Sequence, residues 1–217
     1  MAKSFVLLVL CLSMSLSIAG CGGLEPLRID ALDPLNMALK NSDMKKQKLC
    51  VINSENTRNA YQYIAKFKRG MESYNAGRGV IDPDDAGLEK AIKDILGTIF
   101  GEVIYVNSFE EAHANHAQVV AVLDLYAKIG EITFASTTLD VTVDFRKLGG
   151  ESIAIFKGSG KETVGTKINW RPAAKEALEN LTTALLATVA TPGFTAKIGS
   201  APKLADSAVG PAATVLV

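Results

Sequence analysis

Hydrophobic side chains recur along this chain at two periods, and the switch between the periods predicts the order of its elements. A short apolar run over residues 48–53 is typical of a buried strand. Apolar residues three or four positions apart predict amphipathic helices over residues 59–74 and 88–100. The second helix has the cleaner stripe and ends naturally at Gly101. Its apolar positions are Leu88, Ala91, Ile92, Ile95, Leu96, Ile99 and Phe100.

Strand patterns dominate the second half of the chain. A strand over residues 102–106 is followed by a brief helix over residues 110–117. Residues 119–125 are apolar on both faces, as in a central strand covered on both sides. Residues 139–145 alternate between apolar and polar side chains, which predicts a half-exposed strand that returns over residues 152–158.

A hairpin turn and a closing helix complete the pattern. The turn is Leu148-Gly149-Gly150-Glu151, and the helix starts near Pro172 and ends at Thr191-Pro192-Gly193. The predicted order is strand, helix, helix, strand, short helix, three strands, helix. Because the hairpin strands are segregated from the helices, we expect an α+β fold. In it, amphipathic helices pack on a mixed, mostly antiparallel sheet within a single domain.

The N-terminus has the pattern of a secretory signal. Lys3 precedes an apolar run from Phe5 to Ala19, which ends in small residues. A transmembrane helix needs about 20 consecutive apolar residues. This run is shorter and is interrupted by Ser13, Ser15 and Ser17, so a permanent span is disfavoured. An ordinary cleaved signal followed by a chance cysteine remains an alternative.

The end of this run, Ile18-Ala19-Gly20-Cys21, resembles a bacterial lipobox. The resemblance implies a lipoprotein signal peptide over residues 1–20, removed so that the mature protein begins at a diacylated Cys21 carrying fatty acids such as palmitate. Two or three acyl chains anchor durably, since each buried CH₂ contributes about 0.8 kcal/mol. No Asp follows Cys21, which by resemblance to Gram-negative sorting rules favours the outer membrane over the inner membrane.

Three further regions follow the signal. We expect residues 21–47 to form the lipidated N-terminus and a tether or loose helical segment, punctuated by Pro26 and Pro34. Residues 48–191 would form the α+β periplasmic domain. Residues 192–217 are rich in small residues without a period, which predicts a loosely packed or disordered tail, although residues 213–217 could add an edge strand.

Cysteine and charge usage exclude several classes of protein. Cys11 leaves with the signal and Cys21 carries lipid, so Cys50 alone cannot form an internal disulfide. Its apolar surroundings predict a buried small hydrophobe rather than a catalytic nucleophile. The 23 basic residues balance the 23 acidic ones, and no basic cluster of the kind that binds nucleic acid is present.

The candidate chemistry is thin. His113 and His116 lie with Glu110 and Glu111 on one short segment, but the order differs from H-E-x-x-H, so a solvated helix surface is favoured. Residues 156–163 resemble a P-loop without its first Gly and its final Ser or Thr, and a flexible loop is the better interpretation. The carboxylates expected on neighbouring strands are interpreted as solvated; these are Asp124, Asp140 and Asp144. We therefore predict no catalytic, metal or cofactor-binding residue and no enzymatic activity.

Three segments together resemble a group of small envelope lipoproteins. They are residues 88–106, residues 118–125 and the hairpin of residues 139–156 with its Gly-Gly turn. The group comprises the YajG-like lipoproteins, the periplasmic core of the curli secretion lipoprotein CsgG and the N-terminal domain of TolB. The resemblance implies a non-enzymatic role in docking into or supporting an envelope assembly. The chain has no segment long enough to match the transmembrane hairpins of CsgG, so a pore is not implied.

Two functions follow as expectations. The first is a membrane-anchored structural or adaptor component of a secretion or transport assembly, facing the periplasm from the outer membrane. Its partners would be the membrane, through the N-terminal lipid, and an envelope protein or a second copy of the chain, but not nucleic acid. The alternative is a carrier of a small ligand or lipid, with an apolar cleft between the helices and the sheet.

Overall fold

The sheet has five strands in the order β2-β1-β3-β4-β5. The computed structural model describes residues 27–74, 84–130, 136–163, 170–189 and 191–199. The strands are β1 (Lys48–Asn53), β2 (Glu102–Val106), β3 (Val119–Lys128), β4 (Ser136–Arg146) and β5 (Ser152–Thr163). β1 is parallel to β2 and β3, whereas the longer β3, β4 and β5 pair antiparallel. The predicted α+β fold with a mixed sheet is confirmed.

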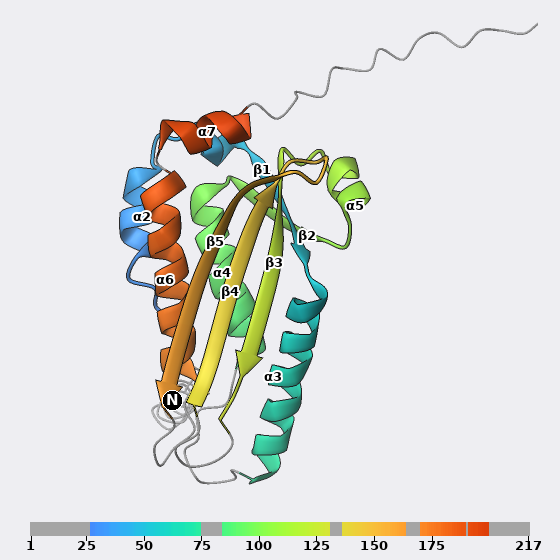
Figure 1. Ribbon diagram of the computed structural model, residues 1–217, viewed down its shortest axis with the longest axis vertical. Coiled ribbons are helices and arrows are strands. Elements are labelled where there is room, and N and C mark those ends of the chain that lie inside the picture. The colour runs from blue at the N-terminus through green and yellow to red at the C-terminus, as the bar shows by residue number, and fades with distance from the viewer. Residues whose placement is uncertain (1–26, 75–83, 131–135, 164–169, 190, 200–217) are drawn as a thin grey trace, which may run out of the picture.

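Helices cover mainly one side of this sheet (Figure 1). They are α2 (Leu32–Ala38), the 3₁₀ turn η1 (Asp43–Lys46), α3 (Glu55–Tyr74), α4 (Asp85–Ile99), α5 (Phe109–Ala114), α6 (Arg171–Val189) and α7 (Pro192–Gly199). α6 packs against β4 and β5, and α3 packs mainly against β3. α5 lies across the sheet from α2, at the same end of the strands (Figure 1).

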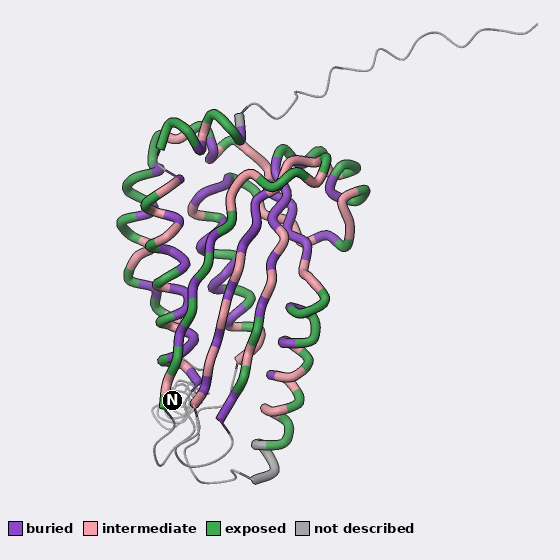
Figure 2. Tube along the Cα trace, in the orientation of Figure 1, coloured by how far each residue is buried: buried purple, intermediate pink, exposed green. Residues whose placement is uncertain are grey.

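The apolar residues separate into two clusters because successive side chains of a strand point to opposite faces. In β1, Leu49 and Val51 belong to the large cluster beneath α2, α4 and α6, and Cys50 belongs to a small cluster beneath α5. Four phenylalanines form the aromatic centre of the large cluster, with ring centroids 5.6–5.9 Å apart; they are Phe100, Phe145, Phe156 and Phe194. Figure 2 shows buried positions alternating with more exposed ones along the strands.

Helix α6 lies directly on two glycines of β5. A Cβ added at Gly158 would stand 2.0 Å from the carbonyl oxygen of Ala177, and one added at Gly160 would stand 1.9 Å from that of Ala173. Only glycine permits so close an approach of helix to strand. The segment that resembles a P-loop is therefore part of strand β5, and its interpretation as a flexible loop is wrong.

The packed body extends beyond both ends of residues 48–191. On the N-terminal side, within the region assigned to the tether, the body includes α2 and η1, whose buried side chains are Leu35, Leu39 and Met44. On the C-terminal side, α7 buries Phe194 and Ile198, so residues 192–199 do not belong to a loose tail. The remainder of the expected tail, residues 200–217, lies outside the described residues.

The long edge strand β5 is partly closed by side chains of α6. The Glu176 carboxylate accepts the backbone N–H of Lys161 at 2.8 Å, and the Asn180 side-chain amide donates to the carbonyl of Ser159 at 2.8 Å. A bulge interrupts the β4–β5 register near Phe145. Bulges and occupied backbone groups both oppose edge-to-edge pairing with another sheet.

Candidate functional site

The predicted lipidation residue, Cys21, lies outside the described residues, and so do residues 1–20. The described chain begins at Leu27, and hydrogen bonds join it to α6 from Asp30 onward. The Glu179 carboxylate accepts the backbone N–H groups of Asp30 and Ala31, the second at 3.0 Å. Lys175 pairs with Asp30 at 2.8 Å, which holds the pKa of that carboxyl below its usual range. Sequence reasoning missed this attachment, because it joins residues about 150 positions apart with no recognisable spacing.

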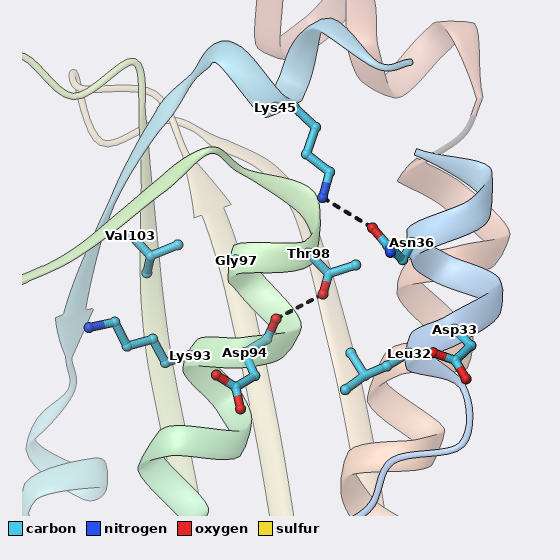
Figure 3. A pocket seen from close by; sticks show the side chains of 9 residues that line it. All are labelled: Leu32, Asp33, Asn36, Lys45, Lys93, Asp94, Gly97, Thr98 and Val103. Atoms are coloured by element: carbon cyan, nitrogen blue, oxygen red, sulfur yellow. Dashed lines mark hydrogen bonds between the residues drawn. The ribbon is translucent and has the colours of Figure 1, made fainter. Parts of the chain in front are cut away.

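A surface groove of about 470 Å³ lies between α2, η1, α4 and β2 (Figure 3). Leu32 and Val103 are its apolar residues, and charged and polar side chains make up most of the rest. Lys45 donates to Asn36 across the groove at 3.4 Å, and Asp94 pairs with Lys90 at 2.6 Å (Figure 3 shows the first contact). The remaining lining residues are Asp33, Lys93, Gly97 and Thr98. This open, mixed surface differs from the apolar cleft that a lipid carrier needs.

Gly97, one of the residues that line the groove, allows the packing of α4 to be tested. It lies in the interior of α4, and an added Cβ would meet no atom within 4 Å. Glycine in a helix interior is less stable than alanine by roughly 0.5–1 kcal/mol. We therefore expect Gly97→Ala to stabilise the folded protein by about that amount. Equilibrium urea unfolding measures the change, and a lower unfolding midpoint would contradict the open space beside Gly97.

The three strand carboxylates share one face of the sheet but differ in their surroundings. Asp124 accepts a hydrogen bond from the Ser54 hydroxyl at 2.6 Å, where β1 passes into α3. Asp144 is only 7% exposed; it receives 2.7 Å contacts from Arg146 and a 2.6 Å hydrogen bond from Ser152. The prediction that Asp144 is solvated is wrong, because alternation sets the face of a side chain but not what covers that face. Asp140 is half-buried.

The His-containing segment forms the surface of α5. His113 and His116 are exposed, as predicted, and His116 adopts the left-handed conformation with φ of 56° just after the helix. Glu111 caps the start of the helix, since its carboxylate accepts the backbone N–H of Asn107 at 2.8 Å and its own N–H donates to Ser108. No three His, Cys, Asp or Glu side chains gather within metal-binding reach in the part of the chain that the structure describes.

The thiol of Cys50 lies in the small cluster on one face of the sheet, and the phenols of Tyr61 and Tyr105 pack against the large cluster on the other. Cys50 is fully buried, as predicted, and burial raises the pKa of its thiol. Burial likewise raises the pKa of Tyr61 and Tyr105, whose enclosed hydroxyls find no hydrogen-bond partner among the described residues. A thiol and two phenols that stay protonated at neutral pH supply neither a nucleophile nor a base.

None of the described helices combines the length and hydrophobicity needed to cross a bilayer. No protein-family model and no curated protein matches the chain. The resemblance to the YajG-like, CsgG and TolB group therefore stays a prediction.

Several solved structures show a distant similarity. A dodecamer of PelC from Paraburkholderia phytofirmans is 13% identical, with 65% of this chain and 88% of that chain covered at a TM-score of 0.38. The hypothetical protein CT253 from Chlamydia trachomatis is 11% identical, with coverages of 69% and 97% and a TM-score of 0.36. Lipoprotein GNA1162 from Neisseria meningitidis is 14% identical, with coverages of 66% and 98% and a TM-score of 0.31. These TM-scores lie below 0.5, so none of these similarities indicates a function for this chain.

Proposed function

We propose that this protein is a bacterial lipoprotein, held by acyl chains on Cys21 at the periplasmic face of the outer membrane, where it is a structural or adaptor component of an envelope assembly. The observation that carries the proposal is the sequence Ile18-Ala19-Gly20-Cys21 at the end of an apolar run of signal-peptide length. A packed body that starts a few residues later fits an anchored domain.

The packing of α6 favours the adaptor over the carrier. A carrier of this fold would hold its ligand between the helices and the sheet. At Gly158 and Gly160 the backbone of α6 leaves no space even for a methyl group. The aromatic centre beside these glycines is filled by the side chains of Phe145, Phe156 and Phe194, which contact one another.

Material from the native host tests both parts of the proposal. We expect intact-mass analysis to find a mature chain that begins at Cys21 and carries fatty acids. We also expect mild-detergent purification, followed by mass spectrometry of proteins and lipids, to recover a stoichiometric envelope protein. A chain that begins at Met1, or that carries no fatty acid, would contradict the anchor. Stoichiometric lipid beyond the covalent acyl chains, without a protein partner, would support the carrier instead.

A further inference from the structure

We propose that the outer side of α2 rests on the phospholipid bilayer, and that the corner of the body carrying α5 points away from it. This inference rests on the lipid anchor proposed at Cys21. It adds an orientation, which acyl chains do not provide by themselves.

The point where the chain leaves the body is fixed on the α2–α6 side. Ile29 is 5% exposed and belongs to the large core cluster. The next two residues, Asp30 and Ala31, donate their backbone N–H groups to Glu179 of α6, and Lys175 of the same helix pairs with Asp30. Leu27 is therefore held close to α2 and the first half of α6.

The tether between this point and the lipid is short. Five residues, Gly22 to Pro26, separate Cys21 from Leu27. Fully extended, that segment spans about 20 Å, at up to about 3.6 Å for each residue. Across the sheet, four steps of about 4.8 Å place β2 about 19 Å from β5, and in Figure 1 α2 stands beyond β5 and α5 beyond β2. The side of the body that carries Leu27 must therefore stay near the bilayer, whereas α5 lies across the sheet from it (Figure 1).

The surface that α2 presents on this side suits a lipid headgroup region. Met37 is 79% exposed, the highest value among the large apolar side chains that the structure describes. Leu35 and Leu39 of the same segment are buried, which fixes Met37 on the outer side of α2. Arg28, 88% exposed and 3.5 Å from Asp30, precedes Met37, and the exposed Lys40 follows it, while the exposed Asp33 lies one turn before it on α2. Apolar side chains enter the interface between headgroups and acyl chains, and basic side chains attract lipid phosphates.

Site-specific quenching tests the orientation in the full lipidated protein. Met37→Cys and His113→Cys, made separately, place one accessible thiol on α2 or on α5; Cys50 is buried, and the unsubstituted protein measures its background labelling. Each labelled protein is reconstituted into phosphatidylethanolamine–phosphatidylglycerol vesicles that carry a headgroup quencher. We expect the fluorophore at position 37 to be quenched several-fold more than the one at position 113.

Lengthening the segment between Cys21 and Leu27 should weaken the preferred orientation. About twenty Gly/Ser residues inserted between Gly23 and Leu24 add a root-mean-square reach of about 25 Å, so the difference in quenching should shrink. The same insertion between Gly199 and Ser200 should leave the difference unchanged. Equal quenching at positions 37 and 113 in vesicle-bound protein would overturn the orientation alone. Failure of the unmodified lipidated protein to float with the vesicles would overturn the anchor and the orientation together.

Discussion

Alanine at Gly158 or Gly160 is expected to destabilise the fold by about 3 kcal/mol or more, which is at the high end for overpacked cores. An alanine Cβ at Gly158 would lie 2.0 Å from the Ala177 carbonyl oxygen and 2.6 Å from the Leu181 nitrogen. At Gly160 it would lie 1.9 Å from the Ala173 carbonyl oxygen. These contacts are with helix backbone, so no side-chain rotation relieves them, and α6 as a whole would have to move off β5.

Urea unfolding of the chain without residues 1–20 and with Cys21→Ser measures this effect. Gly149→Ala is the matched control, since it lies in the adjoining hairpin turn and an added Cβ there meets nothing within 4 Å. If Gly158→Ala and Gly160→Ala unfold at the same urea concentration as Gly149→Ala, α6 can separate from the sheet at little cost. That outcome would also reopen the carrier function, because a ligand layer would need the same separation.

Periodicity is sufficient to locate the large elements of this fold. The strand predicted over residues 48–53 is β1 with the same bounds, and the helix predicted over residues 88–100 is α4 extended by its N-cap, Asp84. Helix α3 starts four residues earlier than the apolar stripe indicates. There Ser54 accepts the N–H of Thr57, and the Thr57 hydroxyl donates to the Leu123 carbonyl. Caps of this kind extend a helix without contributing to its hydrophobic period.

The differences between the predicted and observed fold come from tertiary packing. The seven-residue α2 and eight-residue α7 are too short for a recognisable period, although each inserts apolar side chains into the core. The glycines of β5 suggested a loop because glycine is common in loops. Only the position of α6 shows why this strand needs them. The groove of Figure 3 draws its lining from four elements between residues 32 and 103, so no local motif marks it.

Serine at Cys21 is expected to release the protein from the membrane without changing the stability of its body. Only a cysteine sulfur forms the thioether that carries the glyceride, and the proposed anchor consists of nothing else. Without lipidation the signal could remain uncleaved, and its apolar run could itself hold the chain to a bilayer. A second variant therefore combines Cys21→Ser with an ordinary cleavable secretory signal in place of residues 1–20. We expect the Cys21→Ser chain behind that signal to fractionate entirely with soluble periplasmic proteins.

Cys50→Ser is expected to lower the stability of the body without changing its attachment to the membrane. Cys50 is 0% exposed in the cluster beneath α5, so a hydroxyl there is buried without the solvent it had in the unfolded chain. Such burial costs roughly 1–3 kcal/mol, so this variant should unfold at lower urea while remaining in the membrane fraction. Cys21→Ser should do the reverse, since Cys21 precedes the described body, which begins at Leu27. Membrane retention of Cys21→Ser behind the ordinary signal would mean that the body itself binds the bilayer, and the acyl chains would then not be the anchor.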